Sequence, residues 1–244
     1  IGGQGVFVRA LDDAILRGEI DAAVHSMKDI PAARPVGLAC SAVLERDSPA
    51  DFLAHEGPLD AVRIVGSSST RRRAQVLRDD PTLEVKQLRG NVDTRIRKLH
   101  EGQYDAIMLA EAGLQRLGLQ LPGEALPTDR FVPSPNQGTV AVVCRDDPEI
   151  TGPLAALDHA PTRLDVAIER AVMEEVGGGC FTPQGIYCRD GDLIAEVLAL
   201  DGSRWERIER HVATPEEARE CGRALREKAG DLIREARAAL GLKS

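Results

Sequence analysis

The stretch RIVGSSSTRRRAQVLR at residues 63–78 decides how the middle of this chain folds. Apolar residues lead into three serines and a threonine, and a helical pattern follows. The pattern predicts a strand, a tight loop and a helix whose first N–H groups are capped by hydroxyls and can face an anion. Arginines at that helix start favour a cradle for a carboxylate or phosphate, because a guanidinium donates two parallel hydrogen bonds. A capped surface helix with solvated arginines would explain the same residues.

The alternation of strand and helix continues after residue 78. We expect strands at residues 83–87 and 105–110 and helices at residues 92–100 and 111–117. Such alternation predicts a parallel α/β sheet, and ligands bind these sheets beyond the carboxyl ends of the strands. Arg89 ends one predicted strand and Arg95 lies one turn into the next helix, so both should reach the edge that holds Arg71. Arg116 lies near a third junction, although an exposed helix position would explain it equally well.

The flanking segments predict a second lobe and a different C-terminal unit. We expect a helix at residues 7–16, a strand at 21–26 and a returning strand at 139–144. The proline-rich stretch PTDRFVPSP at 127–135 interrupts the alternation and predicts a crossover between two α/β lobes. Beyond residue 161 we expect an α+β unit with a helix at 162–176, strands with Asp-Gly turns at 190–191 and 201–202, and a final helix at about 215–240.

A carboxylate follows the first predicted strand, in the stretch HSMKDIP at residues 25–31. Asp29 stands beside Lys28 and near Ser26, at a strand end that Pro31 closes. A partly desolvated carboxylate in such a place can stabilise a developing positive charge or relay a proton. A turn aspartate paired with Lys28 is the alternative interpretation, and both stay open on these residues alone.

Cys180 follows Gly177, Gly178 and Gly179 at the predicted end of the helix at 162–176. The glycines leave its sulfur uncrowded, as a covalent attachment point requires. A buried cysteine acting as a small apolar residue is the alternative. The five cysteines are odd in number and form no CxxC pair, which favours a reducing compartment and gives no support for a zinc site. The histidines form no metal-binding pattern, so we assign no metal ligand.

Composition and charge narrow the range of partners. The formal net charge is -8, so an anionic ligand must be held by a local cluster of Arg or Lys. That charge, with an aromatic content of only 3%, argues against nucleic-acid binding. No apolar run approaches the roughly 18 to 20 residues that span a bilayer. We therefore expect no membrane partner, a cytoplasmic location and, by default, a monomer.

Six segments, taken in order, resemble the hydroxymethylbilane synthase (porphobilinogen deaminase) family over nearly the whole chain. They are GGQGVFVRALDDAILRGEIDAAVHSMKDIP at 2–31, VGSSSTRRRAQ at 65–75, LRGNVDTRIRKL at 88–99, YDAIMLAEAGLQRLGL at 104–119, NQGTVAVVCR at 136–145 and ERAVMEEVGGGCFTPQG at 169–185. The resemblance implies an α/β fold with two lobes like those of periplasmic binding proteins and a C-terminal α+β domain that carries the cofactor cysteine. The implied domains are residues 1–42 with 137–158, residues 43–136, and residues 159–244.

The resemblance also implies the reaction. The family condenses four porphobilinogen molecules head to tail, with release of ammonia, to give the linear tetrapyrrole hydroxymethylbilane. The growing oligopyrrole is built on a dipyrromethane cofactor, which would be attached here by a thioether to Cys180. The expected partners are therefore porphobilinogen and the growing chain.

Specific side chains match the family's functional positions. Asp29 matches the catalytic carboxylate that holds pyrrole N–H groups and stabilises the azafulvene cation left when ammonia departs. The matching carboxylate-binding and cofactor-binding positions are Arg71, Arg72, Arg89, Arg95, Arg116, Ser26, Lys28, Ser69 and Gly138. Each pyrrole carries an acetate and a propionate, so an acidic protein needs a concentrated cationic lining to hold the product.

Two departures from the family pattern are visible. The family's first strand and its TR-x-S loop have no counterpart here, so we expect an N-terminal segment to be missing. The family's GGKG reads Gly2-Gly3-Gln4-Gly5, and Gln4 would lose a lysine contact to a carboxylate.

A non-catalytic two-lobed protein that binds a small anion is the main alternative function. Such a protein needs neither Cys180 nor Asp29.

Overall fold

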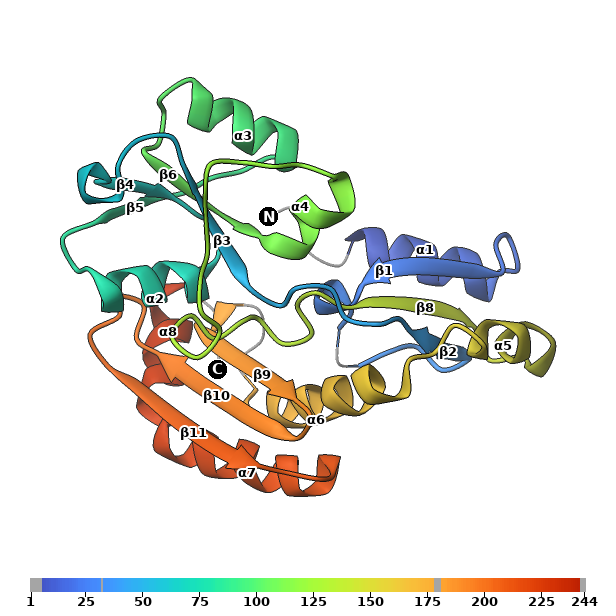
Figure 1. The fold of residues 1–244 in the computed structure, drawn as a ribbon. Helices are drawn as coiled ribbons and strands as arrows, with labels where there is room; N and C mark the ends of the chain where they lie inside the picture. Colours follow the sequence, from blue (N-terminus) through green and yellow to red (C-terminus); the bar gives the residue numbers. More distant parts are fainter. Residues whose placement is uncertain (1–5, 32, 178–180, 242–244) are drawn as a thin grey trace.

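Three separate β-sheets organise the part of the chain that the structure describes (Figure 1). The computed structural model describes residues 6–31, 33–177 and 181–241. Each sheet carries its own helices, so we distinguish an N-terminal lobe, a middle lobe and a C-terminal unit. The two lobes are α/β and the C-terminal unit is α+β, as the sequence predicts.

The N-terminal lobe is built on a small antiparallel sheet. Its elements are α1 (Val6–Leu16), β1 (Ala22–Ser26), η1 (Met27–Asp29), β2 (Leu38–Val43), β8 (Val140–Arg145) and α5 (Pro148–Ala155). Strand β8 lies in the centre and pairs antiparallel with β1 and β2. Ile15 of α1 packs with Val43 and Val143 in the core of this lobe. The expected helix at 7–16 and strands at 21–26 and 139–144 are confirmed, whereas β2 and α5 were not predicted.

The middle lobe holds a five-stranded sheet. Its elements are β3 (Asp51–His55), η2 (Leu59–Ala61), β4 (Ile64–Gly66), α2 (Thr70–Asp79), β5 (Glu84–Lys86), α3 (Val92–His100), β6 (Ala106–Ala110), α4 (Glu111–Leu117) and β7 (Gly123–Ala125). The strand order is β5-β4-β6-β3-β7, and β4 is parallel to β5 and β6. The carboxyl ends of these three strands therefore meet at one edge, as predicted. Strand β3 runs antiparallel to β6 and makes the sheet mixed.

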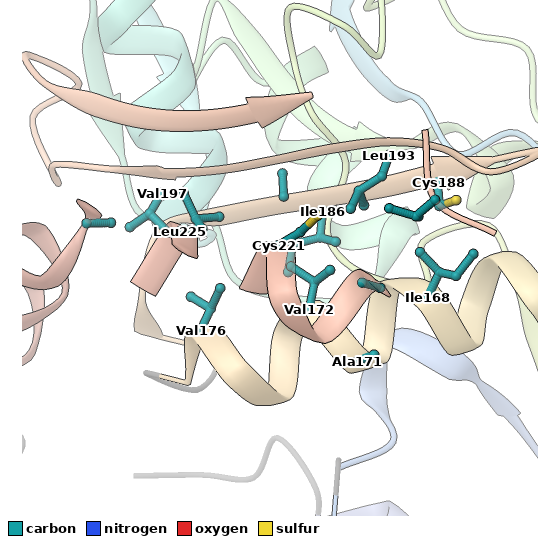
Figure 2. Close-up of a cluster of buried hydrophobic side chains, with 14 of the residues drawn as sticks. Ile168, Ala171, Val172, Val176, Ile186, Cys188, Leu193, Val197, Cys221 and Leu225 are labelled. Carbon is teal, nitrogen blue, oxygen red and sulfur yellow. The ribbon is translucent and has the colours of Figure 1, made fainter. Parts of the chain in front are cut away.

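The C-terminal unit packs helices on an antiparallel sheet. Its elements are α6 (Ala160–Val176), β9 (Gln184–Arg189), β10 (Asp192–Leu198), β11 (Trp205–His211), α7 (Pro215–Lys228) and α8 (Gly230–Ala239). The strands follow the order β11-β10-β9. Figure 2 shows Ile168, Val172 and Leu225 among the side chains buried between the helices and the sheet.

The single final helix expected at about 215–240 is wrong. The chain bends at Ala229, where α7 ends and α8 begins at Gly230. Glycine is a poor residue inside a helix, and the bend places Leu225 and Leu232 in the same core. Burial of both apolar faces therefore outweighs continuation of one long helix.

Helix α6 joins the C-terminal unit to the rest of the molecule. It packs against β9 and α7 on one side and β2 on the other (Figure 1). Glu169 of α6 is fully buried and accepts hydrogen bonds from Arg46 Nη1 at 2.7 Å and from the N–H groups of Asn136 at 2.5 Å and Cys188 at 2.8 Å. Arg46 and Asn136 lie in the two segments that cross between the lobes. Glu169 thus ties both crossovers to the C-terminal unit.

No helix in the described part of the chain is both long and apolar enough to cross a membrane.

Candidate active site

Three distant segments meet around one buried carboxylate. Asp51, the first residue of β3, is fully buried and accepts hydrogen bonds from Arg71 Nη1 at 2.6 Å, Arg72 Nε at 3.0 Å and Gln137 Nε2 at 2.7 Å. Burial opposes the charge on this carboxyl, but the guanidinium groups of Arg71 and Arg72 outweigh it and hold the pKa of Asp51 far below its usual range. Asp51 therefore stays ionised and fixes both arginines.

Arg71 and Arg72 lie in the first turn of α2, at the strand-to-helix junction that the sequence predicts. Ser69 caps the helix, and its hydroxyl accepts from the N–H of Arg72 at 3.4 Å. Arg71 also donates to the carbonyl of Val132 at 3.0 Å, and Arg72 to that of Met108 at 3.0 Å. Both side chains are buried, unlike the solvated arginines of the alternative interpretation. The two guanidinium groups share the single carboxylate of Asp51, so the group formed by Asp51, Arg71 and Arg72 keeps a net positive charge.

Lys28 approaches the same cluster from η1. Its Nζ donates to Gln137 Oε1 at 3.5 Å. Burial, reinforced by the charge of Arg72, lowers the pKa of Lys28 to about 8, although Asp29 and Asp51 act in the opposite direction. The ammonium group is therefore poorly solvated. A negatively charged ligand would relieve that unfavourable environment.

Asp29 is the next residue of this turn. It is exposed and makes no hydrogen bond or ion pair with any residue that the structure describes. The described residues form no ion pair between Lys28 and Asp29, although the charge of Asp29 acts on Lys28, so the structure does not support an ion-paired turn. Ser26 ends β1 beside this turn, is half-buried, and makes no side-chain cap to it. Asp29 is thus available to a ligand.

Gly138 shapes the loop that carries Gln137. Its φ is +86°, and a Cβ there would lie 2.7 Å from the carbonyl oxygen of Asp47 and 2.8 Å from that of Ser48. The Gly138 carbonyl accepts from Arg116 Nη2 at 2.8 Å, and Arg116 also pairs with Asp47 at 2.7 Å. Arg116 is therefore held on the protein and contributes no unpaired charge.

Arg89 and Arg95 occupy the adjacent junction between β5 and α3. Arg95 Nε donates to the carbonyl of Gly90 at 2.8 Å, and burial lowers the pKa of Arg95. Its charge also acts on Arg72, which places it near the cluster. The Ser68 hydroxyl donates to the carbonyl of Leu88 and joins the two junctions. Arg89 is exposed, and among the described residues its side chain has no hydrogen-bond or ion-pair partner.

Two predicted positions, Cys180 and Gln4, lie outside the described residues. The helix that precedes Cys180 ends at Val176, with Gly177 as its cap at a φ of +68°. The remaining predicted residues gather on two structures, the turn at 26–29 and the loops at the carboxyl edge of the middle sheet. Arg116 and Gly138 are joined to each other by a hydrogen bond and belong to neither of these two structures.

Sequence reasoning does not identify Asp51 or Gln137, the two residues that organise the cluster. The available signal was a charged residue at the head of the apolar strand DFLAH. Gln137 has no such signal. Its amide donates to Asp51 and accepts from Lys28 and Arg72, which only the folded arrangement brings together.

Other candidate sites are weaker. A hollow of about 580 Å³ lies among α6, α7 and α8, and another of about 210 Å³ lies near Tyr104, but none of the predicted site residues lines either one. Within residues 6–31, 33–177 and 181–241, no group of three or more His, Cys, Asp or Glu side chains could hold a metal ion. The cationic cluster with its exposed carboxylate remains the strongest site. Chemically, it can bind a polycarboxylate and stabilise a transient cation beside Asp29.

Comparison with protein families gives two matches. Residues 1–152 match the model described as "Porphobilinogen deaminase, dipyromethane cofactor binding domain", and residues 163–231 match "Porphobilinogen deaminase, C-terminal domain". The cluster described above lies within the first match. The second contains most of α6, together with the segment around Cys180.

Individual relatives agree with these matches. A Methanosarcina acetivorans protein named "Probable porphobilinogen deaminase" is 50% identical over 96% of this chain and 78% of its own length. A Methanococcoides burtonii protein of the same name is 48% identical over 97% of this chain and 81% of its own length. Among solved structures, the periplasmic molybdate-binding protein of Azotobacter vinelandii is similar with a TM-score of 0.37 and 14% identity, over 60% of this chain and 75% of its own.

Proposed function

The chain belongs to the porphobilinogen deaminase family, and from that premise we propose how its own residues carry out the family's reaction. The enzyme is a transferase, hydroxymethylbilane synthase, that condenses four porphobilinogen molecules and releases ammonia at each step. The two-lobed binding protein without catalysis is not favoured, because the matched relatives are named as enzymes.

We propose that the pyrrole carboxylates bind to the Lys and Arg side chains that form no ion pair within the described protein. Lys28, Arg89 and Arg95 have no ion-pair partner among the described residues. Arg71 and Arg72, held by Asp51, add fixed positive charge behind them. Arg116 would join this lining only by exchanging Asp47 for a ligand carboxylate. Ser26, Ser69 and Gly138 lie on the segments that border it.

The dipyrromethane cofactor fits this set of donors. A dipyrromethane carries several carboxylates and two pyrrole N–H groups, which call for clustered cations and one acceptor carboxylate. Lys28 and the arginines supply the former, and Asp29 supplies the latter. When bound, the group acts as a primer to which the next pyrrole is joined. We propose Cys180 as its attachment point through a thioether.

Asp29 is our candidate catalytic residue. Loss of ammonia from the aminomethyl group of porphobilinogen leaves a cation that extends over the pyrrole ring, and a nearby carboxylate lowers the energy of that cation. The observation that carries this role is the exposed carboxylate of Asp29, without a protein partner, at the rim of a cationic cluster. It accepts the pyrrole N–H and holds the ring in place.

We also propose the domain boundaries of the chain, its location in the cell and its oligomeric state. Residues 1–42 with 137–158, residues 43–136 and residues 159–244 would form the three domains, in line with the three sheets. The proposed setting is a cytoplasmic monomer without nucleic-acid or membrane partners; the overall charge of -8 opposes binding to a polyanion such as a nucleic acid.

Replacement of Asp29 by Asn tests the catalytic role. The variant should fold normally, because the side chain is exposed and supports no other residue by a hydrogen bond. We expect kcat for ammonia release from porphobilinogen to fall by about 10²-fold or more, the scale of a lost electrostatic contact to a transition state. Steady-state ammonia production measures it.

Asp21→Asn is the matched control. Asp21 is also exposed, and its only described partner is Arg145 at 3.5 Å. This variant should keep the turnover of the unchanged protein. Turnover of Asp29→Asn within about twofold of that control would remove Asp29 from the mechanism.

A further inference from the structure

Helix α6 contacts the turn that carries Asp29 in two ways. Val166 packs with Met27 and Ile30, which flank Asp29, in one buried apolar cluster. One turn later on α6, Arg170 donates from Nη1 to the carbonyl of Ile30 at 3.4 Å and from Nη2 to that of Pro31 at 2.9 Å. Residues four apart lie on the same face of a helix, so Val166 and Arg170 form one docking surface for the turn.

The bonds from Arg170 act on the main chain directly after Asp29. The N–H of Ile30 closes the turn onto the carbonyl of Met27 at 3.1 Å. Arg170 then fixes the two carbonyls that follow, and charged donors make stronger hydrogen bonds than neutral ones. Pro31 has no N–H of its own and adds no further bond to the turn from that group. The direction in which the Asp29 side chain points therefore depends on this contact.

The same helix leads to Cys180. Arg170 lies six residues before Val176, the last residue of α6, so about 9 Å of helix separates them. The segment with Cys180 follows directly. Helix α6 thus runs from the Asp29 turn, which Arg170 contacts, to the start of the segment that holds the proposed attachment point.

We infer that Arg170 is a positioning residue for the condensation reaction: by binding the carbonyls of Ile30 and Pro31, it holds Asp29 at a fixed place relative to the end of α6. Arg170 acts through the main chain of the turn. The inference rests on the proposed role of Asp29. It assigns a function in the reaction to a residue of the C-terminal unit outside the cationic cluster.

The test compares Arg170→Gln with Arg163→Gln in the holoenzyme. Arg163 lies on the same helix and also bridges to the N-terminal lobe, by bonds to Asp158 at 2.7 Å and to the carbonyl of Cys40 at 3.2 Å; among the described residues it has no hydrogen bond to residues 26–31. We expect Arg170→Gln to lower kcat by about tenfold to 10²-fold, because a misplacement of about 1 Å can cost the larger factor. The KM for porphobilinogen should change much less. Arg163→Gln should leave both constants unchanged.

Two further measurements isolate positioning from stability. Amide hydrogen exchange at Ile30 should speed up in Arg170→Gln and stay unchanged in Arg163→Gln, which reports the loosened turn without relying on activity. Arg170→Lys, which keeps a charged donor, should recover part of the lost kcat. Unchanged exchange at Ile30, or equal loss of kcat in both glutamine variants, would overturn the inference.

The outcome is separable from that of the proposed function. If Asp29→Asn retains turnover, the role of Asp29 fails whatever Arg170 does. If Asp29→Asn is inactive while Arg170→Gln has normal kcat and normal exchange, only the positioning role fails.

Discussion

At the scale of single residues, the site depends on a buried carboxylate that no motif identifies. Asp51 neutralises one of the two charges brought by Arg71 and Arg72 and orients both groups. Arg71, Arg72, Arg89 and Arg95 could be found from the sequence because they lie at strand-to-helix junctions. Asp51 could not, since its role depends on β3 reaching the start of α2, a contact between segments that are separate in the sequence.

Replacement of Asp51 by Asn should destabilise the protein strongly. The side chain is fully buried, so the variant leaves two buried guanidinium groups without a counter-charge. We expect the free energy of unfolding to fall by about 3–5 kcal/mol, the cost of breaking a buried ion pair. Urea denaturation measures this change. Asp60→Asn, at an exposed position in η2, should change it by about 0.5 kcal/mol or less.

The pH dependence of that difference checks its electrostatic origin. The pKa of Asp51 is lowered in the folded protein, so its contribution is present above the unfolded pKa and is lost as the pH falls. The gap in unfolding free energy between the unchanged protein and Asp51→Asn should be constant above about pH 5 and shrink below about pH 4. A gap that stays constant through this range would mean that packing, and not charge, explains the loss.

At the scale of elements, local patterns predict the junctions better than the sheet edges. The helices at 92–100 and 111–117 agree with α3 and α4 residue for residue, because capping residues and helical spacing define them locally. Strands β2, β3 and β7 were not predicted. Strand β7 has three residues and is exposed throughout, so its formation depends on pairing with β3; β2 and β3 pair with β8 and β6.

Gly138 gives a test at this scale, because the loop at 136–139 requires its conformation. Gly138→Ala should destabilise the protein more than Gly102→Ala does. Both glycines have positive φ, +86° and +69°, but a Cβ at 138 would meet the carbonyls of Asp47 and Ser48, whereas nothing lies within 4 Å at 102. We expect the unfolding free energies to differ by about 1–3 kcal/mol, the cost of overpacking. Equal losses in chemical denaturation would show that the loop adapts.

At the scale of the whole molecule, buried carboxylates of the C-terminal unit connect it to the site. Glu169 holds the crossover loop next to Gln137, and Glu196 on β10 accepts from Gln75 at 2.9 Å and Arg78 at 2.8 Å, on α2, the helix that also carries Arg71. Figure 1 shows α6 and β9 beneath the two lobes. The order of the three units could be predicted from the sequence. These contacts could not, because they join segments more than 30 residues apart.

The mass of the intact protein tests the central claim most directly. After incubation with porphobilinogen, the protein should carry a mass excess equal to two porphobilinogen molecules less two molecules of ammonia. Cys180→Ala should lack that excess, and Cys40→Ala, a change at an exposed thiol elsewhere in the chain, should retain it. An unmodified mass for the unchanged protein, or the same excess on Cys180→Ala, would contradict a cationic site built around a primer on Cys180.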